Sequence, residues 1–134
     1  MELISWKDSL NVGIVEIDEQ HKKLVGLINK LFEAMANGKS SEIMQSVLSE
    51  LSNYVLTHFA TEEKLMKQLG YEDYEYHKQE HNYFIEKLNE FKIKFSSGKA
   101  SISLELLNFL KDWLLKHIIG TDRKYIPLFK ENGI

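Results

Sequence analysis

The 134-residue chain contains no cysteine, and proline and arginine occur only once each. The lack of cysteine excludes disulfides, thiolate nucleophiles, iron–sulfur clusters and cysteine-based zinc sites. Because Pro127 is the only proline, long uninterrupted helices are permitted. Arg123 is the only arginine, the lysines are scattered and the net charge is −3, so the chain lacks a basic patch for binding nucleic acid.

Long hydrophobic runs are missing as well. The N-terminal residues have neither the basic start nor the apolar core of a signal peptide. The most apolar stretch, residues 104–119, is interrupted by Lys111, Asp112 and Lys116, which argues against a membrane span. The length, with 43% hydrophobic and 28% charged residues, suits one soluble domain that covers residues 1–134. We therefore expect a cytoplasmic protein.

Apolar residues recur three and four positions apart through most of the chain, which is the spacing of amphipathic helices. This pattern predicts helices over about residues 18–36, 41–69, 74–95 and 101–118, with a distorted continuation to about residue 130. Asp18 is the expected N-cap of the first helix, and residues 1–17 form an N-terminal arm. No strand-like alternation competes, so we predict an all-α fold, an up-down-up-down four-helix bundle.

Every histidine of the chain falls on the apolar face of one of these helices. The chain has five of them: His21, His58, His77, His81 and His117. His77 and His81 are four residues apart, so they share one face about 6 Å apart along the axis and could bind one ion together. The same spacing joins His58 to Glu62. Because histidine is the commonest nitrogen ligand for transition metals, the pattern indicates a metal site.

The fourth predicted helix carries His117 and Asp122, which are five residues apart. On a regular α-helix this spacing separates two side chains by roughly 140° around the axis. Both can face the bundle core only if the helix widens or breaks between them, and Gly120 makes this easier. The sequence therefore predicts a π-bulge or a similar local distortion, a feature often found at functional sites.

A single histidine on an apolar helix face is more often a hydrogen-bonded core residue than a metal ligand. Five histidines and two carboxylates are different, because each buried polar group without a partner costs about 1–3 kcal/mol. Their sum would approach the whole stability of a small domain, about 5–15 kcal/mol. Metal coordination satisfies them all, and two carboxylates that could bridge favour a site with two ions. These ligands suit iron, copper, nickel, manganese or zinc, and iron is the first choice.

The same residues carry a resemblance to the hemerythrin family, in particular to its bacterial members, over nearly the whole chain. The matches in the arm and first helix are Trp6, Asp8, Gly13-Ile14 and Ile17-Asp18-Glu19-Gln20-His21-Lys22. The later matches are His58-Phe59, Glu62-Glu63, Met66, His77, His81, Trp113-Leu114, His117-Ile118 and Asp122. Many relatives have a Tyr-Pro step before the third helix, whereas here Tyr71 is followed by Glu72, which leaves the conformation of that loop open.

The resemblance implies a non-haem di-iron centre. It assigns His77, His81 and His117 to one iron, His21 and His58 to the other, and Glu62 and Asp122 to bridging positions. A solvent-derived oxo or hydroxo group would complete the bridges. The second iron would then keep one coordination position free for dioxygen.

The function that the resemblance implies is reversible dioxygen binding, for oxygen storage, delivery or sensing, without enzymatic turnover. Neutral imidazoles donate less charge than carboxylates, which favours reversible binding over oxygenase chemistry. We expect Phe59, Trp113, Leu114 and Ile118 to line or neighbour the oxygen pocket. The expected partners are dioxygen and an electron donor or an oxygen-using protein. The alternatives are a di-iron enzyme with peroxidase, NO-handling or ferroxidase activity, and a structural bundle stabilised by zinc.

Overall fold

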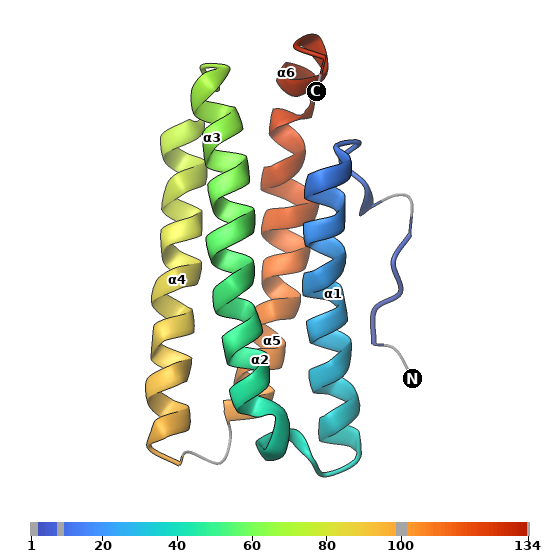
Figure 1. The fold of residues 1–134 in the computed structure, drawn as a ribbon, viewed down its shortest axis with the longest axis vertical. Coiled ribbons are helices and arrows are strands. Elements are labelled where there is room, and N and C mark those ends of the chain that lie inside the picture. Colours follow the sequence, from blue (N-terminus) through green and yellow to red (C-terminus); the bar gives the residue numbers. More distant parts are fainter. Residues whose placement is uncertain (1–2, 8–9, 99–101, 134) are drawn as a thin grey trace.

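The amphipathic segments of the sequence form four long helical rods that run alternately up and down (Figure 1). The computed structural model describes residues 3–7, 10–98 and 102–133, and within these residues the chain forms no strand. The first three rods consist of α1 (Val15–Ala36), then α2 (Ser40–Tyr54) with η2 (Val55–Phe59) and α3 (Ala60–Gln68), then α4 (Tyr74–Ser96). The fourth rod and its continuation are α5 (Ile102–Trp113), η3 (Leu114–Thr121), η4 (Asp122–Tyr125) and α6 (Ile126–Glu131). The predicted all-α, up-down-up-down bundle is confirmed.

The rods form because each carries one apolar face that the other rods bury. Leu24, Ile28 and Leu31 of α1 are fully buried, and their three- and four-residue spacing places them on one side of the helix. The helices α1 and α3 end two residues before Gly38 and Gly70, whose φ angles of 69° and 67° lie in the left-handed region. Glycine adopts this conformation without the strain that a Cβ would cause, so the chain leaves both helices at these turns.

The start of α1 differs from the prediction. The helix begins at Val15, and Asp18, the expected N-cap, lies inside its first turn. The Asp18 carboxylate instead accepts hydrogen bonds from the backbone N–H groups of Val12 at 2.7 Å and Gly13 at 3.3 Å. Asp18 therefore ties the preceding loop to the helix, because its carboxylate satisfies backbone donors outside the helix rather than within it.

Two π-helical turns interrupt the rods. The distortion predicted between His117 and Asp122 is present as η3, a π-helix over Leu114–Thr121. The second π-turn, η2, divides a rod that the sequence predicted as one regular helix, so that prediction is wrong in detail. The wider turn lets two consecutive residues, His58 and Phe59, both point into the core, which a regular helical turn places about 100° apart.

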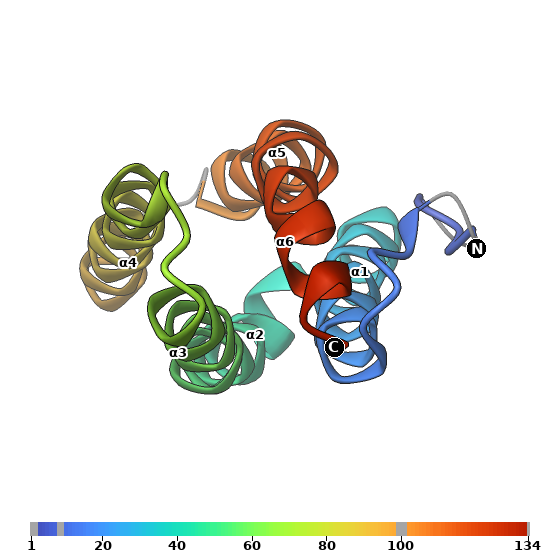
Figure 2. The same ribbon diagram turned by 90° about the horizontal axis from the view of Figure 1, so that it is seen from above.

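The N-terminal arm lies along the outer side of α1 (Figure 2). The side-chain oxygen of Asn29 accepts the backbone N–H groups of Leu3 and Ile4, both at 2.9 Å, and the Asn29 amide donates to the Ile4 carbonyl at 2.7 Å. Asp8 and Ser101, which the sequence placed in the arm and at the start of the fourth helix, lie outside the described residues. Among the helices that are described, none is both long and apolar enough to cross a lipid bilayer.

The buried apolar residues fall into two clusters. The larger cluster fills the body of the bundle and includes Phe59, Phe84 and Trp113. The smaller one lies where the loop before α1, the end of the second rod and the last helices meet, and it includes Met66 and Tyr125. In the view from above, α6 crosses this end of the bundle between α5 and α1 (Figure 2). Polar groups that lie between the two clusters are therefore shielded from both ends.

Candidate metal centre

Seven buried polar side chains meet inside the bundle, and every rod contributes at least one of them. They are His21 of α1, His58 of η2, Glu62 of α3, His77 and His81 of α4, His117 of η3 and Asp122 of η4. None of them exposes more than 1% of its surface. The structure therefore brings together all seven residues that the sequence predicted as metal ligands, and no other histidine occurs in the chain.

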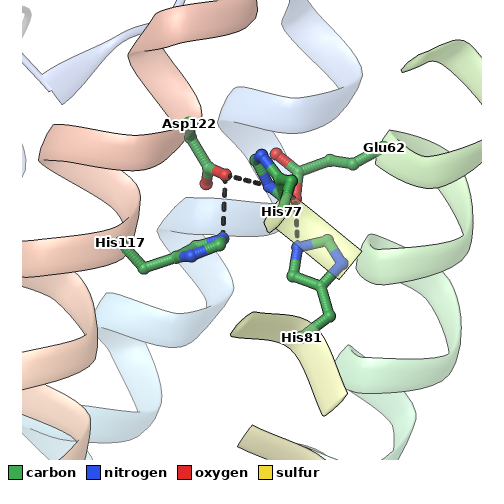
Figure 3. Close-up of side chains that lie close together, drawn as sticks. All are labelled: Glu62, His77, His81, His117 and Asp122. Atoms are coloured by element: carbon green, nitrogen blue, oxygen red, sulfur yellow. Dashed lines mark ion pairs between the residues drawn. The ribbon is translucent and has the colours of Figure 1, made fainter. Parts of the chain in front are cut away.

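Five of these side chains form one compact set (Figure 3). The imidazoles of His77, His81 and His117, called here the three-histidine group, offer ligand atoms within 4.8 Å of one another and of Glu62 and Asp122. Nε2 of His77 and Nε2 of His117 lie 2.8 and 2.9 Å from Oδ1 of Asp122. Nε2 of His81 lies 3.2 Å from Oε1 of Glu62. All three imidazoles thus turn the same nitrogen towards a shared point.

The remaining two histidines form a second set with the same two carboxylates. Nε2 of His21 and Nε2 of His58, the two-histidine group, lie 3.0 Å apart. The His21 nitrogen is 3.1 Å from Oδ2 of Asp122, and the His58 nitrogen is 3.0 Å from Oε1 of Glu62. Glu62 and Asp122 belong to both sets, which is the arrangement that two neighbouring ions with bridging carboxylates require.

The inner atoms of this cluster meet as ion pairs at the distances given above, but the contacts lack good hydrogen-bond geometry. Among the described residues, no hydrogen bond of good geometry reaches Nε2 of His77, His81 and His117, Oε1 of Glu62 or either carboxylate oxygen of Asp122. Leaving such groups unpaired in the interior costs about 1–3 kcal/mol each, and more for charged groups. Because the unsatisfied atoms face common points and are all nitrogen or oxygen, the residues fit a metal centre.

Three imidazoles, those of His58, His81 and His117, have a polar side chain beside Nδ1, the nitrogen that points away from the cluster. Nδ1 of His58 lies 2.7 Å from the amide oxygen of Gln20, and Nδ1 of His81 lies 2.8 Å from a carboxylate oxygen of Glu63. Because these oxygens only accept hydrogen bonds, both Nδ1 atoms donate. In the neutral rings, the lone pair is then on Nε2, the nitrogen that points inward.

Glu80 and Tyr125 complete the outer contacts. A carboxylate oxygen of Glu80 lies 3.5 Å from Nδ1 of His117, and the phenol of Tyr125 donates a 2.6 Å hydrogen bond to Oε2 of Glu62. The sequence pattern did not predict a role for these residues or for Gln20 and Glu63. Only Gln20 and Glu63 had a local signal, because each is adjacent in sequence to a predicted ligand.

The charges of the cluster shift the pKa values of the metal-free side chains. Burial lowers the pKa of His58. Burial acts in the same direction on His77 and His117, but the carboxylates outweigh it and raise their pKa values to about 9 and about 10. Burial raises the pKa values of Glu62 and Asp122, but the neighbouring histidines outweigh it and hold both below their usual range. Both carboxylates are therefore negatively charged near pH 7 and suit a cationic metal.

Aromatic and aliphatic side chains shield the centre on the side of the larger cluster. Phe59 stacks on His81 with ring centroids 3.8 Å apart, and Trp113 stacks on His117 at 4.0 Å. Leu114 and Ile118 are 2% and 1% exposed and belong to the same cluster. These four residues, predicted to line or neighbour an oxygen pocket, thus lie in one apolar region, while their contact with a ligand stays a prediction.

Comparison with known proteins identifies close relatives of the chain. Residues 12–129 match the family model of the hemerythrin HHE cation binding domain. A bacteriohemerythrin of Pseudomonas aeruginosa is 40% identical over 132 residues, covering 98% of this chain and 85% of the relative. A bacteriohemerythrin of Methylococcus capsulatus is 36% identical over 130 residues, covering 95% of this chain and 97% of the relative.

Solved structures show the same similarity in three dimensions. A crystal structure of wild-type hemerythrin superposes with a TM-score of 0.83 at 34% identity, covering 94% of this chain and 97% of that one. A hemerythrin variant with a leucine changed to alanine gives a TM-score of 0.84 at 33% identity, covering 96% of this chain and 98% of the other. The likeness extends over nearly the full length of both chains.

Proposed function

The chain belongs to the hemerythrin family, and we propose that it binds dioxygen reversibly at a non-haem di-iron centre. The observation that carries the proposal is the pair of buried ligand sets that share Glu62 and Asp122. Two sets with common carboxylates provide for two adjacent ions, whereas a single structural ion would need only one of them. The family's relatives are named as bacteriohemerythrins, which supports iron as the metal.

In this proposal the three-histidine group would hold one iron and the two-histidine group the other. Glu62 and Asp122 would be shared between them, together with a solvent-derived oxo or hydroxo group. Two ferrous ions would supply the electrons with which dioxygen is held reversibly. The two-histidine group offers one protein ligand fewer. We therefore assign the position for dioxygen to the iron of the two-histidine group.

The surrounding residues have separate tasks in this arrangement. Gln20 and Glu63 fix the tautomers of His58 and His81, so that Nε2 of each faces the metal. Tyr125 holds the carboxylate of Glu62 in place through its 2.6 Å hydrogen bond. Such outer contacts orient ligands and typically change metal affinity by about 10–100-fold when they are removed.

The apolar residues beside the centre exclude water in this proposal. Phe59, Trp113, Leu114 and Ile118 are all at most 6% exposed and present almost no polar surface. A dry site slows the loss of electrons to solvent-assisted oxidation, and this keeps binding reversible. The proposed role is oxygen storage, delivery or sensing, with an electron donor that keeps the iron ferrous or an oxygen-using protein as partner.

The decisive experiment mixes the anaerobic, reduced, iron-loaded protein with dioxygen and then removes the gas. We expect about two iron ions per chain and an absorption band that appears with oxygen and bleaches under vacuum. Rapid irreversible oxidation, with release of peroxide or turnover of an added substrate, would instead support a di-iron enzyme. Zinc in place of iron, with no optical response to oxygen, would support a structural bundle.

A further inference from the structure

Two buried hydrogen-bond donors near the centre have no evident structural role. Tyr54 of α2 and Trp113 at the end of α5 are 5% and 6% exposed. Among the described residues, neither the phenol oxygen of Tyr54 nor the indole nitrogen of Trp113 has a hydrogen-bond partner of good geometry. The indole N–H of Trp113 interacts with the phenol oxygen of Tyr54 as a donor, so the phenol hydrogen itself still lacks an acceptor. An unsatisfied buried hydroxyl costs about 1–3 kcal/mol, and phenylalanine would fill the position of Tyr54 without this cost.

Both side chains lie directly against histidines of the proposed metal centre. Tyr54 stacks on His58 with ring centroids 5.0 Å apart and planes at 15°, and Trp113 stacks on His117 at 4.0 Å and 13°. Phe59 lies between them, with centroids 5.9 Å from Tyr54 and 5.8 Å from Trp113. The two donors therefore flank the apolar side of the centre from different rods.

Tyr125 provides an internal comparison for Tyr54. Both tyrosines are buried, and each stacks on a histidine of the centre, Tyr125 on His77 at 5.8 Å. The hydroxyl of Tyr125 donates to Glu62 at 2.6 Å, so its position is explained by the protein itself. The hydroxyl of Tyr54 lacks such an acceptor among the described residues, so an acceptor from outside the chain would explain it.

We propose that Tyr54, with Trp113 beside it, donates a hydrogen bond to a small ligand bound at the two-histidine group. The inference rests on the proposed function, under which that ligand is dioxygen. The contact with His58 places the phenol beside the group that offers fewer protein ligands. The pocket is then apolar along its walls and polar at one point, which favours ligands with an acceptor atom.

The surroundings of Tyr54 agree with this role. Tyr54 also lines a cavity of about 480 Å³ between the first and second rods, together with Gln20 and Gly26. The ring of Tyr54 thus contacts both this surface cavity and His58.

The test compares Tyr54→Phe with Tyr125→Phe, which is the same chemical change at a satisfied hydroxyl. In the metal-free protein we expect Tyr54→Phe to melt at the wild-type temperature or above it, and Tyr125→Phe to melt lower. A loss of stability in Tyr54→Phe as large as in Tyr125→Phe would show that the hydroxyl is structural and would overturn the inference. This readout does not depend on iron or on oxygen binding.

Ligand donation is measured with azide and the oxidised, iron-loaded protein. Tyr54→Phe is expected to raise the Kd for azide about fivefold, the equivalent of one hydrogen bond of about 1 kcal/mol. Tyr83→Phe, a change at an exposed residue, leaves the Kd unchanged. The infrared stretch of bound azide should shift between H₂O and D₂O in the wild type and lose this shift in Tyr54→Phe.

The outcomes separate this inference from the proposed function. Equal azide affinity and an equal isotope shift in the wild type and Tyr54→Phe would overturn the role of Tyr54, while reversible oxygenation of the wild type would still support the proposed function. If the wild type fails to bind dioxygen reversibly but Tyr54→Phe still weakens azide, the donor role stands and the proposed function fails.

Discussion

The two histidine groups share both carboxylates but differ in what lies behind their imidazoles. Behind the three-histidine group lie the carboxylates of Glu63 and Glu80, 2.8 and 3.5 Å from the nearest imidazole nitrogens. Behind the two-histidine group lies the neutral amide of Gln20, 2.7 Å from His58. A carboxylate makes the imidazole that it contacts a stronger electron donor than an amide does. Similar imidazoles therefore have two unlike surroundings.

The same difference appears in the protons of the metal-free protein. The pKa values of His77 and His117 are raised to about 9 and about 10, whereas that of His58 is lowered by its burial. Near pH 7 the three-histidine group therefore holds protons that a metal must displace, and His58 is neutral and ready to bind. The surroundings of the imidazoles, rather than the type of side chain, therefore distinguish the two groups.

Removing one ligand from the larger group should have the largest effect. His77→Ala reduces the three-histidine group to two histidines, the number in the other group. We expect iron content to fall from about two ions per chain to one or fewer, and the melting temperature of the loaded protein to drop, because metal binding and folding are coupled. Elemental analysis and thermal unfolding measure both effects.

A matched control for this change is Asn82→Ala, which alters an exposed residue of the same helix. It should keep the wild-type iron content and melting temperature. Wild-type iron content in His77→Ala would remove His77 from the ligand set. Complete loss of both ions would show that the two-histidine group cannot bind iron unless the three-histidine group is also occupied.

Exchanging the outer partners should reduce the difference between the groups. Glu63→Gln replaces a carboxylate by an amide behind His81, and we expect iron to be lost to a chelator about 10–100 times more readily.

Gln20→Glu makes the opposite change behind His58 and should lower the reduction potential of the centre, because added negative charge stabilises ferric iron.

Competition with a chelator measures iron retention in Glu63→Gln, and redox titration measures the reduction potential of Gln20→Glu. Glu86→Gln, on the exposed face of α4, is the control for the loss of one charge. If Glu63→Gln retains iron as the wild type does, the contact with His81 has no bearing on metal affinity. If Gln20→Glu leaves the reduction potential where it was, the charge behind the imidazole does not distinguish the two groups.

The fold and the gathering of seven polar side chains in the core were predictable because their signals are local in sequence. The apolar stripes have the period of a helix, and two pairs on them, His77 with His81 and His58 with Glu62, are four residues apart. The five-residue spacing of His117 and Asp122 predicted the π-helix that the structure has, because both side chains needed to face inward. The second π-turn at His58 had no such signal, since its stripe fits a regular helix equally well.

The outer contacts were not predictable, because they depend on how the rods are aligned with one another. Gln20 and His58 are 38 residues apart, and Tyr125 and Glu62 are 63 apart. No periodic pattern in the sequence determines which residues come into contact when they are so far apart along the chain. The same holds for the start of α1, where Asp18 binds the backbone of the preceding loop rather than that of its own helix.

The proton difference between the groups predicts how metal uptake depends on pH. Because His77 and His117 have pKa values of about 9 and about 10, both are protonated at pH 7, and binding of metal should release about two protons. Calorimetry in buffers of different ionisation enthalpy counts them. Uptake without proton release would contradict the predicted charge of the three-histidine group.

Stability of the metal-free protein should follow the same pKa values. Both folded pKa values lie above the unfolded value of about 6.5, so this stabilisation is complete below that pH and is lost as the pH rises through about 9 and 10. Denaturant unfolding of the metal-free protein should therefore show a decline between pH 7 and 10. A free energy of unfolding that stays constant over this range would contradict the prediction.

The smallest expected effect concerns the apolar residues beside the centre rather than the ligands. Leu114→Ala should leave iron in place and speed the oxidation of the reduced protein in air several-fold, because a smaller side chain admits water. Leu106→Ala removes an equally buried leucine about three helical turns before His117 and serves as the control for lost packing. Oxidation is followed optically at a temperature where both variants are folded. If both variants oxidise equally fast, general loosening of the core is responsible, and the exclusion of water does not depend on Leu114.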